Sequence, residues 1–354
     1  MAADKTVRKN TLAGEDGESD SFHASENSLE QRTTLTAIGK LKTFAGLEAV
    51  EWTFLTISII NVLVAIGITI DRLIELHKNT PDYTFAIILF INIGFCLFYA
   101  VHGVLREREF ELYVYIVGIV VLLIYIIIDL IVNDVNRTTL KWVRFGAIIG
   151  LGPPNIYFAI KVAQGFGYLA FRTVGAAESI HRMYRYAGMF SCLIKFDLQL
   201  AVSLAVFVIM KVNDLQVGDK ITVGIGIPFQ LFWSILGWCA MRREMKILVW
   251  IFAPLSLVEP VYLIYKIVTI AQKWDQNISH GKDVLVYSFL GAAAMAFVVR
   301  VLVGISFWLV VRNFGKGLKE TVFNLPVTGD EPPIFPRKRN TAKCCGVVCC
   351  GPLG

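Results

Sequence analysis

The sequence has few charged residues for its length. Charged side chains make up 18% of the 354 residues, and hydrophobic side chains make up 55%. A soluble domain usually has about a quarter of its residues charged. The hydrophobic residues also gather in blocks long enough to cross the roughly 30 Å of hydrocarbon in a bilayer. This composition excludes an ordinary soluble domain and predicts an all-α integral membrane protein.

Motifs of catalysis and metal binding are also missing. No segment resembles a nucleophile elbow, a P-loop, a zincin motif or a pair of carboxylates at a fixed spacing. The scattered histidines share no metal-ligand spacing with acids or cysteines: His77, His102, His181 and His280. No array of aromatic and basic residues suggests base stacking. We therefore expect no enzyme activity, no metal, no cofactor and no nucleic-acid partner.

Cysteine is missing from every segment that we expect outside the cell, which excludes an extracellular disulfide framework. Cys96, Cys192 and Cys239 fall in hydrophobic blocks, and the other four follow a polybasic run in the tail: Cys344, Cys345, Cys349 and Cys350. Basic residues beside paired cysteines are typical of palmitoylated cytosolic tails. We favour palmitoylation over zinc, because the cysteine spacing is not that of a zinc finger. Unmodified thiols are a third hypothesis.

The hydrophobic blocks predict about eight transmembrane helices, with seven as the alternative. They cover residues 52–70, 83–105, 112–132, 142–171, 189–210, 221–241, 247–271 and 284–311. The fourth contains Pro153 and Pro154, so it is either kinked or re-entrant. The first 45 residues are polar and lack the apolar region of a signal peptide.

These blocks divide the chain into five predicted regions. Residues 1–45 are a disordered cytosolic N-terminal tail, and residues 46–171 are a first transmembrane half with four spans. A cytosolic amphipathic linker helix covers 172–188, a second half with four spans covers 189–320, and a disordered cytosolic tail rich in proline, basic residues and cysteine covers 321–354. Residues 104–115 resemble 240–250, and 171–175 resemble 311–315, so we predict two parallel four-helix halves.

Basic clusters occupy the even-numbered loops and both tails, as in Arg106 and Arg108 or Arg242 and Arg243. The positive-inside rule places these segments, with both termini, in the cytosol. The net charge of +6 then favours anionic lipids of the inner leaflet as partners. Two N-glycosylation sequons, at Asn136 and Asn277, fall in loops that this topology places outside.

Ionisable residues within a bilayer are costly, which makes them candidates for function. Glu259 and Arg300 lie near the middle of the seventh and eighth spans, at the same depth when the rise per residue is counted. We predict that they form an ion pair, which either lines a polar pathway or fixes the register of the two helices. Lys161 in the fourth span lies at about the height of Arg300.

The fifth span carries a polar stripe that repeats every four residues: Ser191, Lys195, Gln199 and Ser203. We interpret it as a face that hydrogen-bonds to other helices rather than a pore, with Lys195 reaching toward the cytosolic interface. Asp197 points elsewhere. The segment before this span has apolar residues at helical spacing, Ile180, Met183 and Tyr184, with His181, Arg182 and Arg185 off that stripe. Glu178 is one turn from Arg182, where the two can pair.

Three short segments carry a resemblance to a known group of proteins: Val174-Gly-Ala, Met183-Tyr-Arg-Tyr and Leu193-Ile-Lys-Phe-Asp-Leu. They are similar to a stretch of uncharacterised eukaryotic multi-pass membrane proteins of no assigned function. The resemblance is limited to residues 172–198 and implies no activity. The sequence leaves two functional hypotheses. One is translocation of a small solute or ion, using Glu259, Arg300, Lys161, Lys195, Asp197 and Gln199. The alternative is a membrane scaffold or sensor that acts through protein partners and inner-leaflet lipids.

Overall fold

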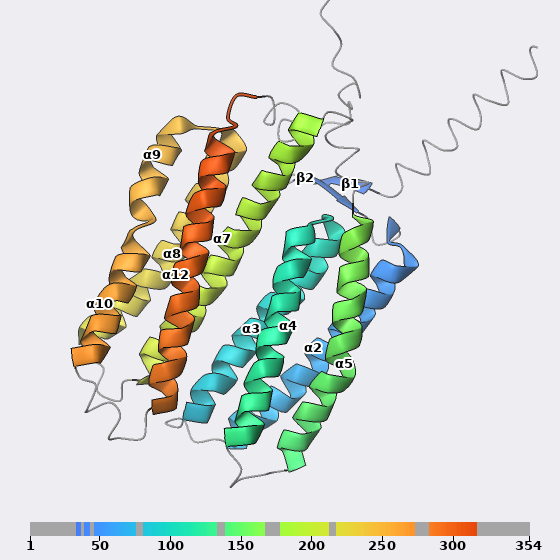
Figure 1. Cartoon of the computed structure of the whole chain (residues 1–354), viewed down its shortest axis with the longest axis vertical. Helices are drawn as coiled ribbons and strands as arrows, with labels where there is room; N and C mark the ends of the chain where they lie inside the picture. Colours follow the sequence, from blue (N-terminus) through green and yellow to red (C-terminus); the bar gives the residue numbers. More distant parts are fainter. Residues whose placement is uncertain are drawn as a thin grey trace, which may run out of the picture.

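The computed structural model describes residues 33–36, 39–42, 46–75, 81–132, 139–166, 178–211, 217–272 and 283–316 (Figure 1). The described elements are a short hairpin and nine helices. The hairpin consists of β1 (Thr33–Thr36) and β2 (Gly39–Lys42). The helices are α2 (Ala49–Glu75), α3 (Pro81–Leu105), α4 (Glu109–Val132), α5 (Thr139–Gly165), α7 (Glu178–Lys211), α8 (Val217–Arg243), α9 (Lys246–Leu255), α10 (Val258–Gln272) and α12 (Asp283–Val311).

The chain is a multi-pass membrane protein, as the hydrophobic blocks predict. Seven candidate spans are long and apolar enough to cross a bilayer: Ala49–Asp71, Tyr83–Leu105, Phe145–Gly165, Glu178–Ile209, Gly224–Arg243, Lys246–Gln272 and Val286–Val311. The sixth of these contains both α9 and α10. Helix α4 is not among the seven. Many large apolar side chains lie on the outside of the bundle, such as Leu63 and Trp250, which are 62% and 82% exposed. These faces suit contact with lipid.

Helices α2 to α5 form a first helix group. Helix α2 contacts α3 and α5, and α4 contacts the same two helices, so the four form a closed ring of neighbours. Aromatic and aliphatic side chains fill the centre of this group, including Phe54, Tyr99, Leu112 and Tyr115, all of which are buried. Phe54 and Tyr115 meet edge to face, with 5.7 Å between ring centroids.

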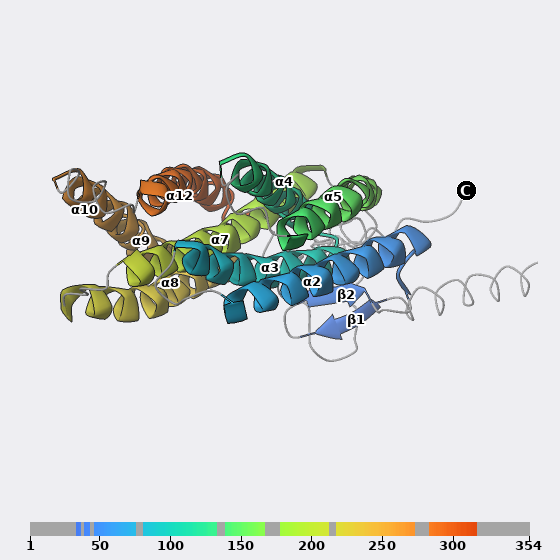
Figure 2. The ribbon, with the colours of Figure 1, turned by 90° about the horizontal axis from the view of Figure 1, so that it is seen from below.

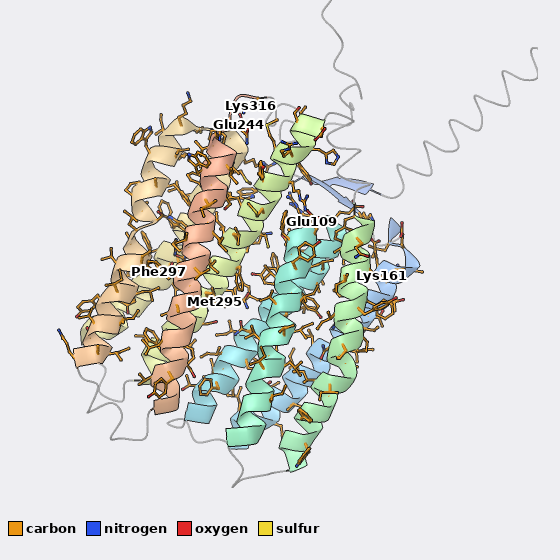
Figure 3. The ribbon with its side chains drawn as sticks, in the orientation of Figure 1. Glu109, Lys161, Glu244, Met295, Phe297 and Lys316 are labelled. Atoms are coloured by element: carbon orange, nitrogen blue, oxygen red, sulfur yellow. The ribbon has the colours of Figure 1, made fainter. Side chains whose placement is uncertain are left out.

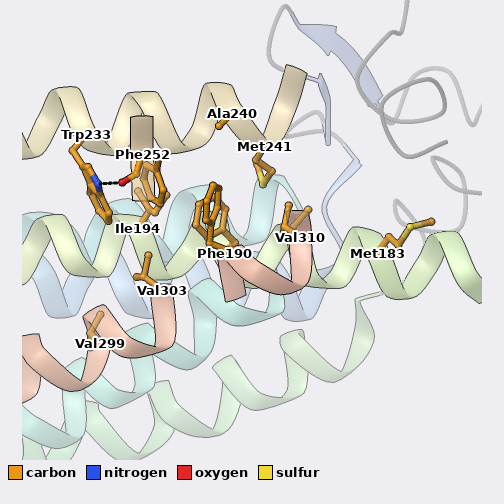
Figure 4. Close-up of a cluster of buried hydrophobic side chains, with 12 residues drawn as sticks. Met183, Phe190, Ile194, Trp233, Ala240, Met241, Phe252, Val299, Val303 and Val310 are labelled. Atoms are coloured by element: carbon orange, nitrogen blue, oxygen red, sulfur yellow. Dashed lines mark hydrogen bonds between the residues drawn. The ribbon is translucent and has the colours of Figure 1, made fainter. Parts of the chain in front are cut away.

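Helices α7 to α10 and α12 form a second helix group. Helix α7 contacts α8 and α12, α8 contacts α9, and α10 contacts α12. Aromatic rings form its core, where Trp233, Phe252 and Phe190 are almost completely buried (Figure 4). The Trp233 indole also donates a hydrogen bond of 3.4 Å to the Phe252 carbonyl oxygen. The two groups meet where α7 contacts α3 and α4 (Figure 2).

The tight loops of the two groups share an unusual backbone conformation. Glu107, between α3 and α4, has a φ of 48°, and Glu244, between α8 and α9, has a φ of 51°. Few residues other than glycine adopt positive φ. Among the described residues, these are the two non-glycine positions where it occurs. Both loops lie at one end of the bundle, together with the C-terminal end of α12 (Figure 3).

Helices α9 and α10 are separated by a break at Ser256 and Leu257. Pro254 lies in the last turn of α9, and Pro260 follows Glu259 in the first turn of α10. A proline inside a helix removes one backbone donor and clashes with the preceding turn, which ends or bends the helix. The predicted seventh span is therefore two helical segments in sequence.

The fourth span is predicted to be either kinked or re-entrant. Helix α5 continues as one helix through Pro153 and Pro154 and contains a candidate span, so the kinked alternative stays a prediction. The span is not re-entrant. The linker helix predicted over 172–188 is helical from Glu178 onward, but it is not a separate element. Residues 178–188 are the first turns of α7, which continues without a break to Lys211. No proline lies in this stretch to end the helix.

The apolar stripe of the predicted linker packs inside the protein. Met183 is 7% exposed, and Ile180 and Tyr184 pack against the core of the second helix group. The polar side is paired as well. Arg185 Nε lies 2.8 Å from Glu109 Oε1, and the predicted pair of Arg182 with Glu178 is present at 3.0 Å. This segment is thus part of the bundle and does not present an apolar face to the leaflet.

Residues 33–36 and 39–42 differ from the predicted disordered tail, because they form two antiparallel strands, with Thr33 opposite Lys42. Threonine is β-branched and favours extended strands. Lys42 Nζ binds Glu51 Oε1 at 2.8 Å and Glu107 Oε1 at 2.9 Å, which ties the hairpin to the first helix group. Burial alone would lower the pKa of Lys42, but the hydrogen bonds and charges of Glu51 and Glu107 outweigh burial and raise that pKa.

Candidate functional site

The centre of the second helix group holds a buried ionic cluster made of Arg300, Asp197, Glu259, Gln230 and Trp233. Arg300 of α12 is its only base among the described residues. Arg300 Nη2 lies 3.0 Å from Asp197 Oδ2 on α7, contacts Glu259 Oε2 on α10, and donates a 3.3 Å hydrogen bond to Gln230 Oε1 on α8. The predicted pair of Glu259 with Arg300 is therefore present, but Asp197 is a second acid on the same guanidinium.

Helix α8 supplies the two residues that hold this arrangement. Gln230 and Trp233 are three positions apart, so both side chains face the cluster. Gln230 Nε2 donates to the same Asp197 oxygen that binds Arg300. The Arg300 guanidinium lies over the Trp233 ring, with 4.0 Å from Cζ to the ring centroid. A desolvated cation over an indole is stabilised by about 2 kcal/mol.

Several polar atoms of the cluster lack hydrogen bonds. Asp197 is fully buried, and its Oδ1 atom has no hydrogen-bond partner among the described residues. The same holds for Arg300 Nε. Two carboxylates face one guanidinium, and buried charge without a partner is costly. With both acids ionised, the cluster has a net charge of −1, and Asp197 Oδ1 can accept one further hydrogen bond.

A cavity of about 360 Å³ adjoins the cluster between α7, α8, α10 and α12. Its polar lining comes from Gln230, Glu259 and Tyr262, and the rest of its lining is apolar, including Phe229 and Phe289. It lies beside the first turn of α10, directly after the break from α9. The break thus places an acid at the edge of an apolar cavity. We call this space the α10 cavity.

A second, partly buried cluster joins the two helix groups. Lys195 Nζ on α7 lies 2.5 Å from Glu111 Oε1 on α4, and Glu111 Oε2 lies 2.5 Å from His102 Nδ1 on α3. The acid that pairs with this ammonium lies in the first turn of α4, and His102 lies in the last turn of α3, so both partners stand beside the tight loop between these helices. The prediction that Lys195 reaches toward the cytosolic interface is compatible with this position and stays a prediction.

The polar stripe of the fifth span does face other helices. Gln199 Nε2 donates to Asn92 Oδ1 on α3, next to the Lys195 contact with α4. Ser203 instead bonds the carbonyl oxygen of Gln199 in its own helix. Gly188 lies on the same side of α7, where an added Cβ atom would be 2.8 Å from Arg108 Nη1. The interpretation of the stripe as an interhelical hydrogen-bonding face is confirmed for Lys195 and Gln199.

The predicted pathway residues do not form one site. Lys161 lies on an exposed face of α5 (Figure 3), 5.8 Å from the Tyr157 ring centroid. It lines a different cavity, of about 330 Å³, together with Lys42, Glu51 and Glu107. Lys195 belongs to the junction of the helix groups. Six residues were candidates for the predicted pathway. Three of them meet in the ionic cluster: Glu259, Arg300 and Asp197.

A protein-family model described as a domain of unknown function (DUF7789) matches residues 38–164 and 174–309. The chain belongs to this family. No curated protein and no solved structure matches the chain significantly. The match confirms the resemblance to a family of no assigned function. The eukaryotic part of that resemblance stays a prediction.

The two segments that match the family follow the two helix groups. The first contains all of α2, α3 and α4 and all but the last residue of α5, and the second runs from before α7 into the last turns of α12. The ionic cluster, the α10 cavity and the Lys195 cluster all lie within the matched residues. The site is therefore built from the part of the chain that defines the family.

Sequence reasoning missed one more polar group, in the first helix group. Asn155 of α5, Ser58 of α2 and Tyr115 of α4 are almost completely buried. Asn155 Nδ2 donates to Tyr115 Oη at 2.6 Å, Tyr115 Oη donates to Ser58 Oγ at 3.2 Å, and Ser58 Oγ donates to Asn155 Oδ1 at 3.0 Å. The sequence signal was an asparagine directly after the two prolines of a hydrophobic block.

Other predictions concern residues that the structure does not describe. The sequons at Asn136 and Asn277 lie outside the described residues, and so do Cys344, Cys345, Cys349 and Cys350. Glycosylation and palmitoylation therefore stay predictions. No group of three or more potential metal ligands occurs among the residues that the structure describes.

Proposed function

We propose that this member of the DUF7789 family translocates a small solute or ion, with its central site at the ionic cluster and the α10 cavity. One observation carries the proposal: the buried pair of Asp197 and Arg300 contacts the partly buried Glu259, which lines a cavity where a membrane-spanning segment is broken. Charged groups deep in a membrane protein are costly and usually mark transport pathways.

The break between α9 and α10 supports this function. Secondary transporters place their sites near the middle of the bilayer, where discontinuous helices offer backbone groups and half-helix ends to the solute. Irregular backbone at that depth is tolerated where it is covered by protein or lines a cavity. Here Glu259 occupies the first turn of the second half-helix and lines the cavity. A pair that only fixed helix register would not require the cavity or the break.

We also propose that α4 is an eighth span and that the two helix groups are parallel repeats. Helix α4 has 24 residues and lies between α3 and α5 in the ring of contacts. The order of helix contacts in the second group follows that in the first, with α9 and α10 in the place of α4. Glu107 and Glu244 have the same rare backbone conformation in corresponding loops. Parallel repeats are one of the architectures of transporters.

The orientation that we propose places the tight loops in the cytosol. Arg106, Arg108, Arg242 and Arg243 lie in or beside these loops, and Lys316 lies at the same end of the bundle (Figure 3). The bias of basic residues toward cytosolic loops sets orientation in most multi-pass proteins. Both chain termini are then cytosolic, and Asn136 and Asn277 are outside.

The test is a flux assay on purified protein in liposomes. A panel of inorganic cations, organic cations, amino acids and neutral solutes is screened by charge movement on a solid-supported membrane and by osmotic swelling. Glu259→Gln should abolish the signal, because it removes the acid that lines the cavity. Glu178→Gln removes an acid whose side chain is 87% exposed and should leave flux unchanged. Equal signals from the wild type, Glu259→Gln and empty liposomes for every solute would overturn the proposal.

A further inference from the structure

We propose that the α10 cavity binds a small organic monocation, with its ammonium group at Glu259 and Gln230 and its apolar body against the remaining lining. This inference rests on the proposed function and names the class of substrate. It draws on the charge of the cluster, the chemistry of the cavity lining and the exposure of the cavity walls.

The charge balance of the cluster calls for one positive charge. Arg300 faces both Asp197 and Glu259, and Asp197 Oδ1 has no hydrogen-bond partner among the described residues. Of the described residues that line the cavity, Glu259 is the only charged one. A single cation at Glu259 would leave Arg300 with Asp197 and bring the cluster to neutrality.

The lining of the cavity favours an organic cation over a bare inorganic one. Hard metal cations such as Ca²⁺ or Mg²⁺ require about six oxygen ligands, whereas the side-chain oxygens here come from Gln230, Glu259 and Tyr262. Three aromatic rings, of Phe229, Tyr262 and Phe289, also line the space. Ammonium groups are attracted to the faces of such rings. Lys266, whose Nζ lies 5.9 Å from the Tyr262 ring centroid, is not a lining residue.

The size and accessibility of the cavity agree with this occupant. Its volume of about 360 Å³ lies at the lower end of the range for small-molecule sites, which is roughly 300–1,000 Å³. Glu259 is the more accessible of the two acids, since its side chain is 14% exposed and that of Asp197 is fully buried. Ile225 and Val258 form exposed apolar walls, so an amine with an apolar body can enter from the hydrocarbon of the bilayer.

The experiment measures binding of radiolabelled phenethylammonium to the purified full chain in nanodiscs, by equilibrium dialysis. Phenethyl alcohol and 3-phenylpropionate serve as neutral and anionic competitors of similar shape. We expect saturable binding of the amine, and competition by the alcohol and the carboxylate at least tenfold weaker than by unlabelled amine. Glu259→Gln should weaken binding at least tenfold, and Glu178→Gln should leave it unchanged.

A second variant guards against a loss of binding through misfolding. Ala205→Phe fills the cavity from α7 without changing a charge, and we expect it to abolish binding while thermal unfolding stays close to that of the wild type. Wild-type binding by both variants would overturn the inference. Equal competition by the alcohol and the amine would also overturn it, because the cavity would then hold any apolar molecule, such as a lipid chain.

The inference and the proposed function can fail separately. If the amine does not bind but another solute shows flux that depends on Glu259, the class of substrate is wrong and the function stands. If the amine binds as expected and no solute crosses the membrane, the site stands and translocation is refuted.

Discussion

Removing the base of the ionic cluster should destabilise the protein more than removing either acid. Arg300→Met keeps the length of the side chain but leaves Asp197 and Glu259 without their shared partner. Breaking a buried ion pair costs about 3–5 kcal/mol, because a charge stays buried without compensation. The lost contact with Trp233 adds about 0.5–2 kcal/mol. The variant should therefore unfold at a clearly lower temperature, which fluorescence-monitored thermal unfolding in detergent measures.

A rescue variant tests whether charge is the cause. Arg300→Met combined with Asp197→Asn and Glu259→Gln removes every charge of the cluster and should recover most of the lost stability, since buried ion clusters can often be replaced by uncharged groups at little cost. Arg312→Met is the matched control, because Arg312 is exposed and directly follows α12, the helix that carries Arg300. It should change the stability little. A triple variant no more stable than Arg300→Met would refute the reasoning.

Three further predictions concern other parts of the bundle. Gly237→Ala should lower the free energy of unfolding by about 1–3 kcal/mol, because its methyl group would lie 2.5 Å from an aromatic carbon of Phe252. Gly224→Ala, on the same helix, is the control, because its methyl group meets nothing within 4 Å. Thermal unfolding compares the two variants, and equal stability would contradict the close packing at Gly237. Lys195→Met should lower the free energy of unfolding by up to about 3–5 kcal/mol, because Glu111 then keeps only its contact with His102, and adding Glu111→Gln should restore most of the loss. A double variant as unstable as the single one would argue against pairing. Lys42→Met should lower the free energy of unfolding by about 1–3 kcal/mol near neutral pH. Because folding raises the pKa of Lys42 above 10.5, the stability difference between wild type and variant should be complete below pH 10.5 and vanish at higher pH. A difference that does not depend on pH would show that charge is not involved.

The sequence predicted the parts of the fold that depend on distance along one helix. Hydrophobic length marks a span, and the rise per residue places Glu259 and Arg300 at one depth. The partners of the charged residues depend on how each helix is rotated about its axis and on which helices are neighbours. Asp197 faces Arg300 because α7 packs on α12, and Lys195 faces Glu111 because α7 also contacts α4. Neither rotation can be derived from spacing within α7.

The segment before the fifth span shows a second limit. An apolar stripe beside basic residues is typical of a helix on a membrane surface and equally of a helix end packed on a bundle. Met183 and Arg185 satisfy both patterns. The structure selects the second, because Glu109 and the second helix group offer partners that are close in space and distant in sequence.

The order of the buried charges along the chain has a consequence for biogenesis. The ribosome synthesises the chain from its N-terminus, and each helix enters the membrane beside the helices that were made earlier. Glu111 precedes Lys195, and both Asp197 and Glu259 precede Arg300. Lys195 and Arg300 therefore each enter the membrane after the acids that bind them. The last helix, which carries Arg300, meets a binding site that is already negative, so its insertion and the closure of the second helix group are expected to be one event.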